Sequence, residues 1–262
     1  MDLGIKGKCA LITGGSHGIG RAIASALADE GCNVAICARN KDRIEQTIED
    51  IKKRDVDCNV DCIGISADVL IPDDIDFVVN TVINKWKKID ILVNNVGGGG
   101  RWGSENILET KEQVWLDVYN KNALTAIRFT MKLIPYMIQY KWGRVVTIAS
   151  IYGKESGGRP WFNMAKSAEI SLMKTLSMNQ EFVRNGITFN SVAPGAIMIP
   201  DTGWEKEQNG PKFKYMLDKE FPLGRLGTPE EVANLVAFIC SEKSSIINGA
   251  CITADGGQSK SF

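Results

Sequence analysis

Histidine is almost absent from this sequence, which contains only His17 among its 262 residues. A metal site built from several histidines is therefore excluded, and a Ser-His-Asp triad would have to use a histidine inside a glycine-rich loop. Cysteine occurs in an odd number without a C-x-x-C pair, so neither a disulfide framework nor a zinc site is indicated. Several cysteines stand in apolar runs, where we expect small core residues in a reducing cytoplasm. The seven are Cys9, Cys32, Cys37, Cys58, Cys62, Cys240 and Cys251.

Long apolar runs and an excess of one charge are also missing. No uninterrupted apolar stretch approaches the ~18 residues of a membrane span, and the first residues lack the basic-then-apolar layout of a signal peptide. Lys+Arg and Asp+Glu number 31 each, so the formal net charge is zero. Nothing in this balance directs the chain to nucleic acid or to an anionic membrane. We expect a soluble, cytoplasmic protein without a nucleic-acid or membrane partner.

The sequence does contain a repeated alternation of strand and helix patterns. Apolar, β-branched runs predict strands at residues 9–13, 34–38, 60–66, 89–94, 144–148, 187–193 and 251–254. Helical periodicity predicts helices at residues 19–30, 41–54, 72–87, 111–140, 162–184 and 229–240. Apolar strands in this order give a Rossmann-like, doubly wound parallel α/β sheet of about seven strands with helices on both faces. Because the sequence has no linker and no repeat, residues 1–262 are expected to form one domain. Pro135 is expected to kink the helix predicted at residues 111–140.

A glycine-rich turn, residues 13–20 (TGGSHGIG), joins the first predicted strand to the first helix. Glycines let the backbone approach a pyrophosphate, and the helix N-terminus faces its negative charge. The spacing of Gly14, Gly18 and Gly20 therefore predicts a dinucleotide site. The same residues also spell G-x-S-x-G, the nucleophile elbow of α/β-hydrolases, but that interpretation needs a histidine downstream and none follows His17.

The end of the second predicted strand bears on the choice of coenzyme. An acidic residue at this point would bind the ribose 2′-hydroxyl of NAD, whereas a nearby arginine suits the 2′-phosphate of NADP. The chain has Ala38, Arg39 and Asn40 there, with no carboxylate to repel a phosphate. We therefore predict NADP(H), although Arg39 as a solvated residue at a helix entry is the alternative.

Motifs along nearly the whole chain resemble those of the short-chain dehydrogenases/reductases. They include the turn at residues 13–20, the segment 67–69 (ADV), the segment 94–97 (NNVG) and Pro194-Gly195, and residues 222–257 resemble 3-oxoacyl-carrier-protein reductases. The resemblance implies the fold above, an NAD(P)-dependent oxidoreductase, and a homodimer or homotetramer built on the two long helices. It assigns coenzyme binding to Gly14, Ser16, His17, Gly18, Ile19, Gly20, Arg39, Asp68, Val69, Asn95, Val96, Gly97, Lys166, Pro194, Gly195 and Ile197.

The same resemblance implies a catalytic set of Asn122, Ser150 and Lys166, together with position 162. In the family that position is a tyrosine, which exchanges a proton with the substrate oxygen, and here it is Phe162. The lysine lowers the pKa of the tyrosine and holds the nicotinamide ribose, the serine polarises the carbonyl, and the asparagine supports a proton relay. Each of these residues also has a non-functional interpretation when it is taken singly. Ser150 would be a serine at a strand end, Lys166 a lysine on a helix surface, and Asn122 an exposed asparagine of a helix.

Phe162 leaves three interpretations open. It is an engineered replacement of tyrosine, or a natural residue in a site with another proton donor, or the mark of a catalytically weak relative that binds coenzyme for a regulatory or scaffolding purpose. Loss of a general acid or base costs ~10²–10⁴-fold in rate. Tyr152, two residues after Ser150, is a hypothetical substitute donor, but we prefer the alternative that it packs against the neighbouring loop.

Two loops are expected to border the substrate, residues 98–103 (GGGRWG) and 156–161 (SGGRPW). Each places an arginine, Arg101 or Arg159, near a tryptophan, and arginine forks recognise carboxylate or phosphate. We therefore expect an NADP(H)-dependent interconversion of a secondary alcohol and a ketone on a polar, anionic hydroxy or oxo substrate; solvated loop arginines are the alternative. Residues 201–221 resemble the family's substrate lid, with a surface helix pair as the alternative.

Overall fold

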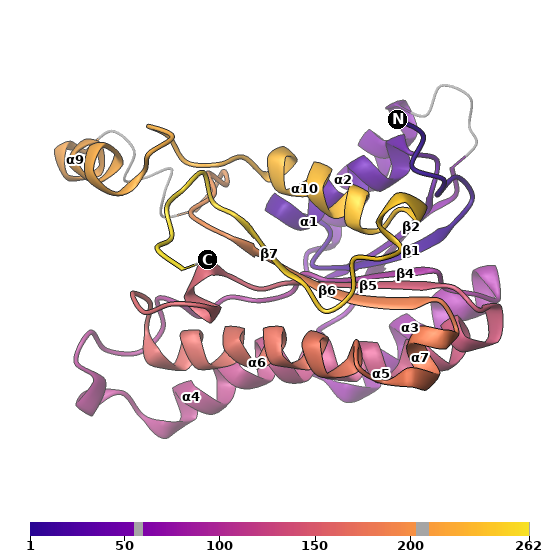
Figure 1. Ribbon diagram of the computed structural model, residues 1–262, viewed down its shortest axis with the longest axis horizontal. Helices are drawn as coiled ribbons and strands as arrows, with labels where there is room; N and C mark the ends of the chain where they lie inside the picture. Colours follow the sequence, from indigo (N-terminus) through magenta and orange to yellow (C-terminus); the bar gives the residue numbers. More distant parts are fainter. Residues whose placement is uncertain (55–59, 203–209, 262) are drawn as a thin grey trace.

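A single seven-stranded sheet organises the computed structural model, which describes residues 1–54, 60–202 and 210–261. All strand pairings are parallel, in the order β3-β2-β1-β4-β5-β6-β7 (Figure 1). This order confirms the predicted doubly wound sheet, because the winding direction reverses between β1 and β4. The strands are β1 (Cys9–Thr13), β2 (Asn33–Ala38), β3 (Cys62–Ser66), β4 (Ile91–Asn94), β5 (Gly143–Ile148), β6 (Ile187–Pro194) and β7 (Cys251–Ala254).

Helices cover both faces of the sheet, which explains why the central strands are apolar at nearly every position. In Figure 1, α1 (Gly18–Asp29), α2 (Lys41–Arg54) and α10 (Pro229–Ile239) lie on one face. The other face carries α3 (Pro72–Trp86), α4 (Glu112–Tyr119), α5 (Thr125–Tyr140), α6 (Pro160–Leu176) and α7 (Gln180–Arg184). The helix α9 (Pro211–Glu220) projects beyond one end of the sheet, and the short turns are η1 (Ile107–Glu109), η3 (Ile151–Gly153) and η4 (Glu242–Ser244).

Two predicted helices are interrupted in the structure. Between α4 and α5 lies a π-helical segment, η2 (Asn120–Leu124), and Pro135 sits inside α5, which continues to Tyr140. The helix predicted at 162–184 stops at Leu176 and restarts after Asn179, whose side chain accepts hydrogen bonds from the backbone of the next helix at 2.9 and 3.2 Å. An asparagine cap of this kind satisfies helix-terminal N–H groups and therefore defines a new start.

The core lies in two layers, one between the sheet and each set of helices. Neighbouring residues of one strand feed opposite layers, as Leu11 and Ile12 of β1 do, because side chains alternate along a strand. Burial raises the pKa of the Cys37 and Cys240 thiols to about 12, so these cysteines serve packing. Cys58 lies outside the described residues. Across the described chain, no helix is both long and apolar enough to cross a bilayer.

Candidate active site

The turn between β1 and α1 has the geometry of an anion site. Gly14 and Gly18 adopt positive φ angles of 65° and 53°, which favour glycine. A side chain on Gly20 would collide with the carbonyl oxygen of Gly14, so this turn closes only around glycine. The cap residue His17 makes no side-chain cap hydrogen bond, and the first turn of α1 has no acidic residue. The first amides of this twelve-residue helix are thus available to a negatively charged group.

Asn95, after β4, fastens this turn to the centre of the sheet. Its side-chain amide donates to the carbonyl oxygens of Thr13 and Gly14 at 2.9 and 3.2 Å. The Thr13 hydroxyl in return accepts hydrogen bonds from the backbone N–H groups of Asn95 and Val96, both at 3.0 Å. The reversal point between β1 and β4 is therefore locked by reciprocal hydrogen bonds.

Two adjoining cavities open at the carboxyl ends of the strands, and they share Asn95 and Gly97. We name them by the strand each adjoins: the β5-side cavity has a volume of about 570 Å³ and the β2-side cavity about 290 Å³. Of the predicted residues, the β5-side cavity gathers His17, Gly18, Ile19, Asn95, Gly97, Ser150, Phe162, Lys166, Pro194, Gly195 and Ile197. The β2-side cavity gathers Gly14, Arg39, Asp68, Val69, Asn95, Val96 and Gly97.

Three predicted residues do not line either cavity. Gly20 is buried inside α1, where it permits the close turn. Ser16 lines a neighbouring groove beside α1, α2 and α10, which shares His17 and Gly18 with the β5-side cavity. Asn122 is fully buried behind the cavity wall, so the alternative of an exposed helix asparagine is wrong. Gly20 and Asn122 instead contact the backbone of the two loops that border the cavities.

Asn122 holds the loop after β4 in place. Its side-chain oxygen accepts from the Gly98 N–H at 3.0 Å, while its amide donates to the carbonyl oxygens of Gly98 and Val118 at 2.9 and 2.7 Å. It stands in the π-helical segment η2, and such segments are frequent at functional sites. A side chain on Gly97 would lie 2.8 Å from the Asn122 oxygen and 2.9 Å from the Lys166 ammonium, so the backbone passes closely between them.

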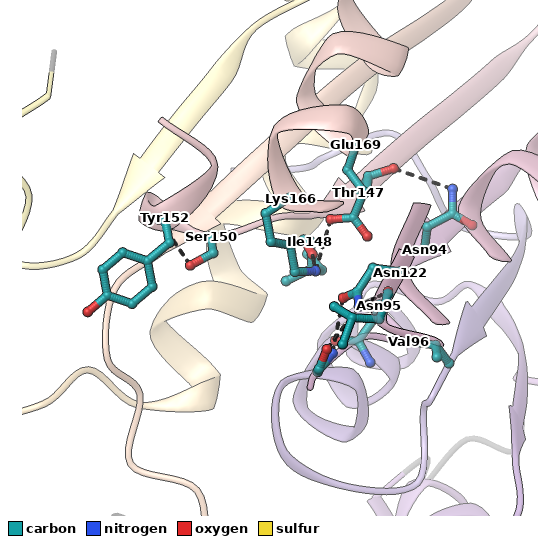
Figure 2. Close-up of polar contacts among 12 residues, drawn as sticks. Asn94, Asn95, Val96, Asn122, Thr147, Ile148, Ser150, Tyr152, Lys166 and Glu169 are labelled. Carbon is teal, nitrogen blue, oxygen red and sulfur yellow. Dashed lines mark hydrogen bonds and ion pairs between the residues drawn. The ribbon is translucent and has the colours of Figure 1, made fainter. Parts of the chain in front are cut away.

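Lys166 is buried, with 4% of its surface exposed, and is not a helix-surface lysine. Its ammonium donates to the Ile148 carbonyl oxygen and to the carboxylate of Glu169, both at 2.9 Å (Figure 2). Burial raises the pKa of Glu169 to about 7, and the attraction of Lys166 limits that rise. Glu169 was missed by sequence reasoning, although its i+3 spacing from Lys166 places both on one helix face.

At position 162, where a tyrosine hydroxyl is expected, the structure has the phenyl ring of Phe162 close to Lys166. Phe162 lines the β5-side cavity, with its ring centre 5.8 Å from the Lys166 nitrogen. The hydroxyl oxygen of Ser150 accepts a hydrogen bond from the Tyr152 N–H at 3.2 Å, which leaves the serine proton able to donate. Tyr152 reaches the cavity lining, but Figure 2 shows its ring extending away from Ser150 and Lys166.

The Tyr152 ring packs against the loop before α6. This agrees with our expectation that Tyr152 packs against the neighbouring loop and does not replace the tyrosine as proton donor. Side chains built on Gly157 and Gly158 would lie 2.9 and 3.0 Å from it. Burial first, and then the charges of Glu220 and Glu155, raise the pKa of its phenol. This environment makes Tyr152 a weaker acid than an ordinary tyrosine, which counts against a role as substitute donor.

The predicted arginine–tryptophan pairs do not share one environment. Arg101 lines the β5-side cavity and Trp102 the β2-side cavity. Arg159 instead donates to the Ser104 carbonyl oxygen and pairs with Glu105, and the neighbouring Trp161 is fully buried. The second loop therefore supports the first, and the expectation that Arg159 and Trp161 border the substrate is wrong. Long arginine side chains reach backbone carbonyls that a sequence does not reveal.

The predicted lid contributes only in part to the described site. Of its described residues, Thr202 lines the β5-side cavity, next to Ile199 just before the predicted lid, and α9 forms a small apolar cluster with the segment before α10. Residues 203–209, including Trp204, lie outside the described residues. Lys121, missed by sequence reasoning, lines the β2-side cavity with its ammonium 4.8 Å from the Trp102 ring centre. Burial, then the charges of Arg39 and Lys166, lower the pKa of Lys121.

Comparison with known proteins assigns this geometry to a family. A family model described as enoyl-(acyl carrier protein) reductase matches residues 14–259. A 3-oxoacyl-(acyl-carrier-protein) reductase of Staphylococcus epidermidis is 35% identical over 253 residues, which cover 95% of this chain and 98% of the relative. The chain belongs to the short-chain dehydrogenase/reductase family, and it is an oxidoreductase of the alcohol and carbonyl class that uses NAD(P).

Solved structures agree in fold and differ in coenzyme. L-sorbose reductase from Gluconobacter frateurii, complexed with NADPH and L-sorbose, has a TM-score of 0.89 at 32% identity and covers 100% of both chains. A 7α-hydroxysteroid dehydrogenase complexed with NADH and a 7-oxo bile acid has a TM-score of 0.87 at 26% identity, covering 98% of this chain and 96% of that one. The relatives thus share the sheet and the redox class, while their substrates range from sugars to steroids.

Proposed function

We propose that this chain interconverts a secondary alcohol and a ketone with NADP(H). One observation carries the proposal: the β5-side cavity brings Ser150, Phe162 and Lys166 to the same side as the glycine turn. A dinucleotide fits the residues present, because the start of α1 is uncapped and free of acidic residues, and the two adjoining cavities continue from it. A bound nicotinamide would give or take the hydride.

The choice of NADP(H) rests on Arg39 rather than on the relatives, since their structures hold either coenzyme. Arg39 is exposed, lines the β2-side cavity and directly follows β2. A guanidinium in this position offers several N–H donors to a 2′-phosphate. Asp68 and Val69, which line the same cavity, would contact the adenine.

The chain's own residues divide the chemistry among them. The first amides of α1 would bind the pyrophosphate, and Lys166 would hold the nicotinamide ribose. The Ser150 hydroxyl would donate a hydrogen bond to the substrate oxygen and stabilise the negative charge that develops there during reduction. Asn122 keeps the Gly98 backbone in position, and Phe162 supplies an apolar wall without a proton.

Calorimetry and a paired assay test this function. We expect uptake of NADPH by the folded chain, and NADPH consumption with a panel of ketones by both this chain and Phe162→Tyr. Failure to bind either pyridine coenzyme would overturn the proposal. Binding with turnover only in the tyrosine variant would favour a second function, that of a coenzyme-binding relative with a regulatory or scaffolding role, for which the absent hydroxyl is the observation.

For the substrate we propose a polar, anionic hydroxy or oxo compound, such as a sugar acid or an acyl-carrier conjugate. The support is Arg101, which lines the β5-side cavity on the loop after β4. Arg101→Ala is expected to raise the KM for anionic ketones ~10-fold or more, because a charged hydrogen bond is lost, while the KM for neutral ketones stays the same. Equal effects on both classes would remove the anionic preference.

The remaining proposals concern the domain organisation, the oligomeric state and the cell compartment of the protein. We infer one coenzyme-binding domain over residues 1–262, because all described strands belong to one sheet. Exposed Leu116 of α4 and Met131 of α5 favour a homodimer or homotetramer that covers this side, which light scattering would test. Five buried cysteines, Cys9, Cys32, Cys37, Cys62 and Cys240, suit a reducing cytoplasm.

A further inference from the structure

The β5-side cavity contains few groups that are able to supply a proton. Among the described residues that line it, the titratable side chains are His17, Arg101, Tyr152 and Lys166. A ring nitrogen of His17 already hydrogen-bonds with the Pro200 carbonyl oxygen at 3.0 Å. Arginine stays charged, and the Tyr152 ring turns away from Ser150 (Figure 2). Lys166, with its nitrogen 5.8 Å from the Phe162 ring centre, is therefore the titratable group of this lining best placed to supply a proton.

Behind Lys166 lies a carboxyl group that the reaction described above does not use. Glu169 is 1% exposed, and its carboxylate oxygen is 2.9 Å from the Lys166 ammonium. Burial removes water from both charges of the pair, which costs free energy. The ionised pair of ammonium and carboxylate is therefore closer in free energy to the neutral pair of amine and carboxylic acid than it is in water. The 2.9 Å contact gives a proton a direct path between the two groups.

No other charge competes with Lys166 for Glu169 within the described chain. The helix α6 packs against α4, η2, η3, β5 and β6, whose titratable side chains are Glu112, Asp117, Tyr119, Lys121, Arg144 and Tyr152. None of these is among the causes that shift the pKa of Glu169, which are burial and Lys166 alone. Lys166 is therefore the one charged group paired with Glu169 among these elements, and of the two residues only Lys166 lines the cavity.

We propose that Lys166 and Glu169 form a buried proton-holding pair that takes the place of the tyrosine hydroxyl in this site. The proposal rests on the proposed function, and within it Glu169 is a positioning residue that acts through Lys166. In the active state Lys166 is an ammonium and Glu169 a neutral carboxylic acid.

The proton balance of a reduction follows from that state. Hydride reaches the carbonyl carbon, the π electrons of the C=O bond move to oxygen, and oxygen takes a proton from the Lys166 nitrogen. The resulting amine takes the carboxylic proton of Glu169, so the step ends with an ammonium beside a carboxylate. One proton from the bulk solution then returns through Lys166 to Glu169, so the reduction consumes one hydride and one solvent proton, and alcohol oxidation reverses these transfers. The net acid is a carboxyl that titrates near neutrality, which suits general acid catalysis at physiological pH.

Glu169→Gln in the full chain tests the pair, because glutamine keeps the shape and removes the titration. With NADPH and a ketone, kcat of the unmodified chain is expected to fall as pH rises past about 7, as the carboxylic proton is lost. The variant is expected to be ~10–10²-fold slower and to lack this break. Glu181→Gln, on exposed α7, is the matched control and should leave the profile unchanged.

A tyrosine background separates a proton role from a structural one. In Phe162→Tyr the phenol supplies the proton, so adding Glu169→Gln should cost less than about 3-fold in kcat, below the range for loss of a general acid. An equal loss in both backgrounds, or a pH profile that Glu169→Gln leaves unmoved, overturns the pair. Turnover that never appears despite coenzyme uptake, or no uptake at all, instead overturns the proposed function on which the pair depends.

Infrared spectroscopy of the coenzyme-free chain gives a result independent of turnover, including when Glu169→Gln does not fold. The unmodified chain should show a buried carboxylic-acid band that disappears as pH rises through about 7. The band should persist in Glu181→Gln and be absent from Glu169→Gln. No such band between about pH 5 and about pH 7 would overturn the pair.

Discussion

At the scale of single residues, the proposed site combines groups that line the β5-side cavity with groups that lie behind it. Ser150 and Lys166 face the β5-side cavity, while Asn122 and Glu169 lie behind it and reach it through the Gly98 backbone and the lysine ammonium. Substitutions in the first pair should affect chemistry directly, and substitutions in the second should affect it through geometry or proton supply.

Ser150→Ala removes the hydroxyl that we propose as the donor to the substrate oxygen. We expect kcat for ketone reduction to fall ~10²–10³-fold, because one donor to a developing oxyanion is lost, whereas the Kd for NADPH remains as it was. Steady-state kinetics and calorimetry measure the two quantities. Ser245→Ala, an exposed serine outside both cavities, is the control; a comparable loss there would remove the assignment of Ser150.

Arg39→Leu removes the guanidinium at the end of β2. The expected result is ~10–10²-fold weaker binding of NADPH with little change for NADH, because a charged hydrogen bond contributes about 1.5–3 kcal/mol. Titration calorimetry with both coenzymes checks it. Arg184→Leu, on exposed α7, is a matched loss of one arginine away from the site. If both coenzymes weaken equally, Arg39 is a general surface charge and NADP(H) is not the preferred partner.

At the scale of elements, the turn between β1 and α1 depends on close backbone contact. Gly20→Ala places a methyl group against the Gly14 carbonyl and the Asn95 amide. We expect a loss of about 1–3 kcal/mol in the free energy of unfolding, as overpacking in a tight site costs, together with loss of coenzyme uptake. Urea denaturation and calorimetry measure these effects. Ser25→Thr adds the same methyl group to α1 at a half-buried position, and equal stability of the two variants would contradict the prediction.

The elements themselves were predictable where the sequence gives an unbroken signal. The central strands are apolar on both faces, which produces the short runs that sequence reasoning uses. The break before α7 was missed because Ser177, Met178 and Asn179 do not interrupt helical periodicity, and only the asparagine cap creates the new start. The first strand residues predicted at Val60 and Ile89 lie two positions before the observed starts of β3 and β4.

The candidate site was predictable for a different reason. Motif order identified Ser150, Lys166 and Phe162, which line one cavity. Glu169 was missed because an acidic residue in a helical pattern is typical of a solvated face, and its burial is a tertiary effect. The role of Arg159 was misjudged because its partner, the Ser104 carbonyl oxygen, belongs to the main chain and leaves no mark in the sequence.

At the scale of the whole molecule, the buried carboxyl links stability to pH. Folding raises the pKa of Glu169 from 4.5 to about 7, so between these values the folded chain binds a proton that the unfolded chain has released. The contribution of Glu169 to the free energy of unfolding is therefore largest below about pH 4.5. It falls by up to about 3 kcal/mol as pH rises to about 7, and it does not change further above that pH.

The corresponding measurement is urea unfolding across this pH range for the unmodified chain and for Glu169→Gln. The difference in free energy of unfolding between them should decline by about 3 kcal/mol from about pH 4.5 to about pH 7. Glu181→Gln supplies the reference for an exposed glutamate. A difference that does not vary with pH would show that the carboxyl of Glu169 remains ionised throughout.

The hydrogen bonds between Asn95 and Thr13 join residues 82 positions apart. A nascent chain that has formed β1, β2 and β3 therefore still lacks the contacts that fix the glycine turn. During synthesis on the ribosome, we therefore expect the proposed coenzyme-binding turn to become fixed only after β4 has emerged and paired with β1. Coenzyme binding would then report that the two halves of the sheet have joined. A fragment ending at residue 66, which lacks β4, is expected not to bind coenzyme.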